Sequence, residues 1–216
     1  RCVSDLDHWR RVRDAEHTLL PRIARFAEDT RGCSLCDEAT RHFYVTHSSP
    51  ESDRSARPAF ESWFALAWVP GGIYGGIRAE DHHAWWSGTS LGVTWLASAP
   101  AVSDFERSFI LTAARSPHSL LLVDSVWPGW LFIVRDLLTG RLFRVTDPEI
   151  SKHVQPDYVL FSAVLTLDGV STLLGCASHA VDADVRDMAC ATRECEADGA
   201  WLTRSSLLSL TPELAS

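Results

Sequence analysis

The chain has 216 residues, of which 46% are hydrophobic and 22% charged, as in ordinary folded globular proteins. Its 20 basic and 28 acidic side chains give a net charge of −8, which argues against a protein covered by a nucleic-acid-binding surface. Six cysteines are too few for a disulfide scaffold, and no apolar run reaches the roughly 18–20 residues of a membrane span. We therefore expect a cytoplasmic protein with reduced thiols and no membrane contact. Because the chain begins at Arg1 and ends abruptly at Ser216, we also expect a fragment of a longer protein.

The N-terminal third has apolar residues at helical steps of three and four. Residues Leu6–Asp29 follow this period, but Pro21 interrupts it, so we expect two shorter helices that meet there. A further helix is expected over Ser34–Tyr44. One face of that helix would carry Leu35, Ala39 and Phe43. The polar stretch Ser48–Pro58 is typical of a loop.

An aromatic helix is expected over Phe60–Trp68, where apolar side chains cover most of the circumference. This pattern predicts a central, buried helix. The stretch Gly71–Gly92 is rich in glycine and contains Trp85 and Trp86, and we interpret it as a loosely ordered or inserted loop. The next helix, Phe105–Ala114, follows two residues that can both cap it, Ser103 and Asp104.

From Ser119 onward the period becomes that of strands. We expect the strands Leu120–Val126, Leu131–Val134, Phe143–Val145, Tyr158–Leu167 and Val170–Leu174. Tight turns are expected at Pro128-Gly129, Thr139-Gly140 and Asp168-Gly169. Five short strands joined by such turns indicate an antiparallel meander or a small barrel. Helices are again expected over Asp182–Glu196 and from about Thr203.

The predicted fold class is α+β. An N-terminal helical layer (residues 1–115, with the loop at about 71–92) packs on a C-terminal antiparallel β-meander or small barrel (116–180), and a helical tail (181–216) follows.

The strand-rich half resembles a known family. Residues Ser119–Val145 contain a strand, a Pro-Gly turn, the motif Arg-Asp-Leu-Leu-Thr-Gly at Arg135–Gly140, and another strand. Together with Pro156–Val164, Asp168–Val170 and the helix Phe60–Phe64, this order is similar to bacterial proteins labelled SEC-C domain-containing or SEC-C-associated, mostly uncharacterised. The zinc-chelating tail behind that label does not occur in this chain. The resemblance therefore implies an architecture and no activity.

Two sets of cysteine and histidine residues are candidates for a metal site. The first consists of Cys33, Cys36, His42 and His47, whose ligands lie closer together than a zinc finger requires. Because Cys33 and Cys36 fall on an expected helix, we favour packing in the core. The second set, which joins a strand end to a helix, consists of Cys176, His179, Cys190 and Cys195. Neither matches a strong zinc pattern, so we expect no metal and no cofactor.

The sequence contains no catalytic motif that specifies a reaction. Ser116–Ser119 places a histidine beside serines, but a turn before a strand explains it. Trp127, Trp130, Arg135 and Asp136 are the candidate binding residues at the rim of the sheet. A local role for Arg135 and Asp136, in pairing and turn capping, is the favoured interpretation. From Ser119 to Gly175 the charges sum to −2, so nucleic acid is an unfavourable ligand.

We therefore expect a non-enzymatic binding or accessory module that contacts another protein. The alternative is a metal-binding protein or metal-dependent enzyme with a site of dispersed histidine, cysteine and acidic residues. The sequence leaves the partner, the ligand and the oligomeric state open.

Overall fold

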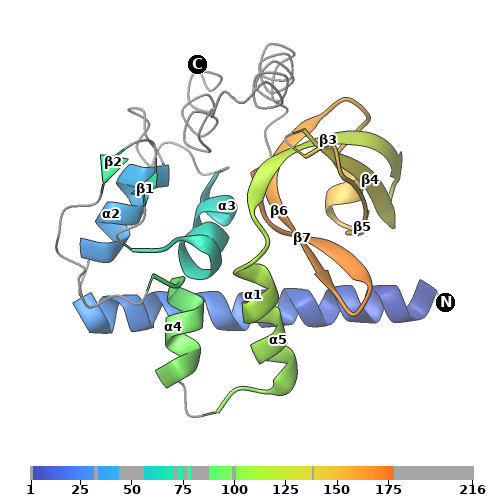
Figure 1. Ribbon diagram of the computed structural model, residues 1–216. Coiled ribbons are helices and arrows are strands. Elements are labelled where there is room, and N and C mark those ends of the chain that lie inside the picture. The colour runs from blue at the N-terminus through green and yellow to red at the C-terminus, as the bar shows by residue number, and fades with distance from the viewer. Residues whose placement is uncertain are drawn as a thin grey trace.

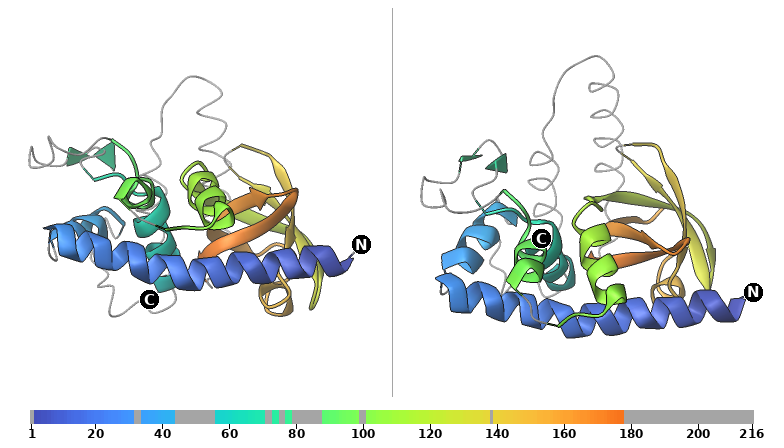
Figure 2. Two further views of the ribbon diagram at one scale, coloured as in Figure 1. Left: turned by 90° about the horizontal axis from the view of Figure 1, so that it is seen from below. Right: turned by 60° about the horizontal axis from the view of Figure 1, so that its bottom comes forward.

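The computed structural model describes residues 2–31, 34–43, 56–70, 73–74, 77–78, 88–98, 101–137 and 139–177. Within these ranges, helices form one part of the molecule and a closed five-stranded barrel forms the other, so the α+β class is confirmed. A single long helix, α1 (Cys2–Arg31), runs along both parts (Figures 1 and 2). The expected tail helices after residue 181 lie outside the described residues.

Helix α1 is continuous, and the expectation of two helices meeting at Pro21 is wrong. One stripe of buried residues runs along it on both sides of Pro21, namely Val12, Ala15, Leu19, Ile23 and Ala27. Pro21 itself is exposed. A proline removes one helical hydrogen bond and crowds the preceding turn. On the solvent side these costs do not disturb the packed stripe, which holds the helix together.

The other helices of the layer pack around this stripe. Their bounds are α2 (Ser34–Phe43), α3 (Arg57–Ser62), α4 (Leu91–Ser98) and α5 (Asp104–Ala113). Helix α2 buries Leu35, Ala39 and Phe43 as predicted. Helix α5 begins at the expected cap, because the Ser103 hydroxyl accepts from the Glu106 backbone N–H and the Glu106 carboxylate accepts from the Ser103 backbone N–H.

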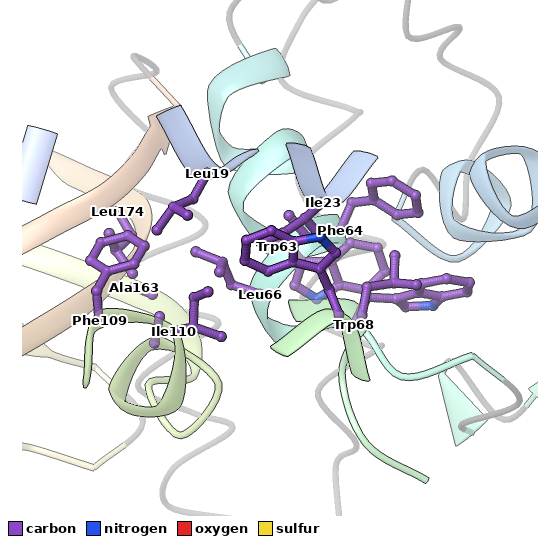
Figure 3. Packing of buried hydrophobic residues seen from close by; sticks show 14 of the residues in the cluster. Leu19, Ile23, Trp63, Phe64, Leu66, Trp68, Phe109, Ile110, Ala163 and Leu174 are labelled. Atoms are coloured by element: carbon purple, nitrogen blue, oxygen red, sulfur yellow. The ribbon is translucent and has the colours of Figure 1, made fainter. Parts of the chain in front are cut away.

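The aromatic helix is buried, as its composition predicts, but it changes form along its length. Helix α3 continues directly into a π-helical turn, Trp63–Ala67. Figure 3 shows Trp63, Phe64 and Trp68 packed between α1 and the remaining helices. The same cluster contains Ala163, Leu165 and Leu174 from the barrel, so helices and barrel share one hydrophobic core.

The stretch Gly71–Gly92 contains more structure than expected. Strands β1 (Ile73–Tyr74) and β2 (Ile77–Arg78) pair in antiparallel fashion within it, and α4 begins at its end. Helix α4 was not predicted. Its sequence shows little amphipathic period, because Val93 and Ala97 are apolar as well although only Leu91, Gly92, Trp95 and Leu96 are buried. Gly92 lies close to the Ala65 carbonyl oxygen, 3.0 Å from where a Cβ would stand.

The barrel has the strand order β3-β4-β5-β7-β6, with β6 returning to β3. Its strands are β3 (His118–Trp127), β4 (Leu131–Asp136), β5 (Leu142–Thr146), β6 (Val159–Leu167) and β7 (Val170–Ala177). The predicted turns are confirmed: Gly129 has a φ of +77°, and Asp168 and Gly169 have φ values of 49° and 81°.

Side chains of helix α1 cover the place where strands β5 and β7 of the barrel meet, which we call the seam. Strands β5 and β7 meet in parallel at Val145 and Ser171. Beside this point the Arg13 guanidinium lies 2.5 Å from the Asp147 carboxylate and donates to the Leu173 carbonyl oxygen at 2.8 Å. It also pairs with Glu16, whose carboxylate accepts from the Gly175 N–H. Polar groups at the β7 edge are therefore satisfied by side chains of α1.

None of the helices in the described part of the chain is long and apolar enough to cross a membrane.

Candidate functional site

The β3–β4 hairpin carries side chains alternately into and out of the barrel. Phe132 and Val134 of β4 belong to the barrel core, so Ile133 and Arg135 between them point outward. In β3 the register with β4 shifts between Val123 and Ser125, which marks a bulge at Asp124. Strands β4 and β5 lie on the side of the barrel away from α2, α3 and α4, while α1 runs along the barrel (Figure 1).

Two tryptophans stand at the tip of this hairpin. Trp127 and Trp130 occupy the first and last positions of the β3–β4 turn, which the Trp130 N–H closes by donating to the Trp127 carbonyl oxygen at 3.1 Å. Their exposed fractions are 46% and 40%. Leu142 of β5, opposite Arg135 in the register, is 53% exposed. Among the residues the structure describes, the remaining exposed large apolar side chain is Leu111 on α5.

Arginines lie among these apolar side chains. The Arg144 guanidinium lies over the Trp130 ring, 5.8 Å from its centroid, and is 3.4 Å from the Asp5 carboxylate. Arg135 lies 3.3 Å from Asp124. Both ion pairs are exposed to solvent and contribute little to stability. We call the surface formed by Trp127, Trp130, Arg135, Leu142 and Arg144 the Trp–Arg face.

Asp136 does not belong to the Trp–Arg face. It follows Arg135 in β4, so it points inward, where it is buried at the mouth of the barrel. Its carboxylate accepts hydrogen bonds from the Ser119 hydroxyl at 2.8 Å and from the Thr139 N–H at 3.1 Å. This is the turn-capping role that the Thr-Gly turn favours. Of the four candidate binding residues, Trp127, Trp130 and Arg135 share the outer surface.

A pocket of about 400 Å³ opens at the same mouth of the barrel. It is lined by Ala67, by Ala114–Ser119, and by Asp136 and Thr139. The stretch Ser116–Ser119 therefore forms a wall of this pocket and the start of β3.

The histidine of that stretch forms a buried contact with another element. His118 Nε2 lies 3.1 Å from the Ser62 hydroxyl of α3, and the hydroxyl donates to the Ala59 carbonyl oxygen at 3.1 Å. Ser62 is fully buried, so this pair joins α3 to the barrel.

The metal candidates do not converge within the described part of the chain, where no cluster of three metal-ligating side chains occurs. Cys36 is exposed on α2, so the expectation that it packs in the core is wrong. It lies about 100° around the helix from Leu35, outside the buried stripe. His42 is buried and its Nδ1 accepts from the Trp68 Nε1–H at 3.2 Å. Outside the described residues lie Cys33, His47, His179, Cys190 and Cys195.

The one described cysteine of the second set is Cys176 in β7. Burial is the main cause that raises the pKa of its thiol to about 12, with the Asp147 carboxylate as a further cause. A thiol with such a pKa is a poor nucleophile at neutral pH.

Leu142 and Arg144 were not among the candidate residues. The alternation of β5 places Leu142 and Arg144 together on the side opposite Phe143 and Val145, and this pattern is visible in the sequence. The register that puts Arg144 beside Ile133 and close to Trp130 is a tertiary feature.

Comparisons of the chain with protein-family models, with curated proteins and with solved structures gave no match. The resemblance to the SEC-C-associated family therefore stays a prediction, and the function is argued from the site itself.

Proposed function

We propose that this protein is a non-enzymatic binding module that contacts another protein through the Trp–Arg face. One observation carries the proposal: of the four large apolar side chains exposed in the described part of the chain, three lie on the outer side of β3, β4 and β5, with Trp127 and Trp130 at the hairpin turn and Leu142 opposite Arg135. Leaving a tryptophan in water forgoes the hydrophobic gain of burying it. Tryptophan and arginine are also the side chains that most often dominate binding energy at protein interfaces.

The placement of the face supports the same function. The hairpin that carries the two tryptophans belongs to a closed barrel and contains a β-bulge at Asp124 and a two-residue turn at Pro128-Gly129. A preorganised surface loses less conformational entropy when it binds. We assign the protein to the cytoplasm as part of this proposal, because six cysteines in 216 residues are too few for a disulfide scaffold.

Site-specific photo-crosslinking in the native cells tests the proposal. Trp130 is replaced by a photoreactive phenylalanine derivative, and Leu111, an exposed apolar residue on α5, serves as the matched control position. We expect a discrete crosslinked species from position 130 that position 111 does not give and that Trp127→Ala abolishes. Identical products at the two positions, or none at position 130, would contradict the proposal.

A further inference from the structure

We infer that the pocket at the mouth of the barrel binds a small zwitterion, a molecule of the size of an amino acid that carries a carboxylate and an ammonium group. The pocket is separate from the Trp–Arg face, so this inference goes beyond the proposed function and does not depend on it. The volume of the pocket is about 400 Å³. Small-molecule sites commonly have volumes of about 300–1,000 Å³, and the mouths of β-barrels are one of their usual places.

The pocket lies where the helical layer meets the barrel. Its wall is formed by Ala67 of the π-helical turn, by the segment Ala114–Ser119 that leads from α5 into β3, and by the end of β4 with the turn that follows it. A π-helical turn is rare and frequently lies at a functional site. The pocket is therefore shaped by the packing of several elements and not by a single loop.

The negative charge of the pocket is the carboxylate of Asp136. This residue is 6% exposed, and its Oδ1 accepts from the Ser119 hydroxyl at 2.8 Å and from the Thr139 N–H at 3.1 Å. Ser119 and Thr139 line the pocket as well. Because these bonds fix the carboxylate in the wall, it is preorganised to pair with an ammonium group.

The positive charge of the pocket is the guanidinium of Arg115, which follows the C-cap of α5. Arg115 is exposed, and none of the ion pairs within the described part of the chain involves it. A guanidinium presents paired N–H groups in one plane, which match the two oxygens of a carboxylate. Arg115 can therefore bind the carboxylate of a ligand.

These two opposite charges select the class of ligand. A simple anion in the pocket would be repelled by Asp136, and a simple cation would be repelled by Arg115, whereas a zwitterion can pair with both. The side chains of Ala67, Ala114 and Pro117 add apolar surface to the wall. An amino acid with an apolar side chain meets all of these requirements.

Isothermal titration calorimetry of the full chain with L-amino acids as probes tests the inference. The strongest binder among the common L-amino acids, identified by saturation-transfer NMR, is compared with its N-acetyl derivative and with its amide. The first derivative lacks the ammonium charge, and the second lacks the carboxylate. We expect a Kd below about 1 mM for the amino acid and about tenfold weaker binding for each derivative.

Two variants locate the binding site. Arg115→Gln should weaken binding of the amino acid about tenfold, and it should not weaken binding of the amide, which has no carboxylate to lose. The matched control Arg107→Gln removes another exposed arginine of the same helix and should change binding less than about twofold. Ala114→Leu, which fills part of the pocket, should abolish binding, with circular dichroism to verify that the variant is folded.

Three results would overturn the inference. One is that none of the amino acids binds. The second is that either derivative binds as tightly as its parent, because the pocket would then not recognise both charges. The third is that Arg115→Gln leaves binding of the amino acid unchanged, which would place the ligand elsewhere on the molecule.

Discussion

Gly175 in β7 shows at the scale of a single residue how tightly helix α3 packs against the barrel. A Cβ at this position would stand 2.1 Å from the Pro58 carbonyl oxygen and 2.3 Å from the Ser62 hydroxyl oxygen. Gly175 also has a positive φ, of +49°. Gly169 has a positive φ too, of +81°, but nothing lies within 4 Å of the place where its Cβ would stand. Comparing the two glycines therefore separates crowding from backbone strain.

We expect Gly175→Ala to lower the free energy of unfolding by more than about 3 kcal/mol, because backbone strain and overpacking add together. Gly169→Ala should lower it by about 1 kcal/mol, from strain alone. Urea denaturation followed by circular dichroism measures both. Equal losses would mean that α3 does not approach β7 as closely as the structure has it.

Among the elements, helix α1 is attached to the barrel through Arg13. Removing Arg13 leaves Glu16 and Asp147 without their cation, and the Asp147 side chain is 2% exposed. We expect Arg13→Met to lower the free energy of unfolding by about 3–5 kcal/mol, the usual effect of breaking a buried ion pair. Arg10→Met, on the same helix, removes an exposed pair with Asp7 and should change it by less than about 1 kcal/mol. Similar values for both variants in chemical denaturation would show that the seam is solvated.

The π-helical turn Trp63–Ala67 lies in the hydrophobic core that helices and barrel share. Trp63 is 5% exposed and contacts Phe43 and Trp68 within the shared core, so Trp63→Ala should lower the free energy of unfolding by about 3–5 kcal/mol. Trp127→Ala makes the same chemical change at an exposed position and should lower it by about 1 kcal/mol or less. The same denaturation experiment measures both variants. A large loss for Trp127→Ala would assign that side chain a structural role in the barrel.

Stability of the whole molecule should depend on pH through its buried histidines. Burial lowers the pKa of His8 below its ordinary value of 6.5, although the carboxylate of Asp168 opposes this effect. Burial also lowers the pKa of His42, with Glu38 opposing. The unfolded chain then binds more protons than the native protein once the pH falls below 6.5. The stabilising contribution is present above pH 6.5 and is lost as the pH falls toward the lower folded-state values.

We expect the urea concentration at the unfolding midpoint to decrease when the pH is lowered from 7.5 to 5.5. His8→Leu should make this fall smaller, because the variant removes one of the two groups and the His8 Nε2 has no hydrogen-bond partner among the described residues. Equilibrium urea titrations at the two pH values provide the measurement. A midpoint that stays constant in the wild type would show that these histidines are as solvated in the folded state as in the unfolded chain.

Much of the architecture could be predicted because local rules specify it. The strand period, the glycines at positive φ and the Ser103 cap all act over a few residues, so the barrel strands, the turns and the start of α5 are confirmed. The position of Trp127 and Trp130 at an exposed hairpin turn could also be predicted locally, since a Pro-Gly turn at the end of a strand places its flanking residues at a rim. Asp136 could be assigned to turn capping on the same basis.

Only the tertiary structure decided the features that depend on distant parts of the chain. Pro21 continues α1 because the buried stripe on both sides outweighs one lost hydrogen bond, and α4 exists because its neighbours bury Leu91, Gly92, Trp95 and Leu96. The sequence by itself determined which residues alternate on each strand, since side-chain direction has a period of two. Which outer surface stays uncovered, and that Arg144 reaches Trp130 there, depends on the register of β5 against β4, which is set by barrel closure and not by neighbours in sequence.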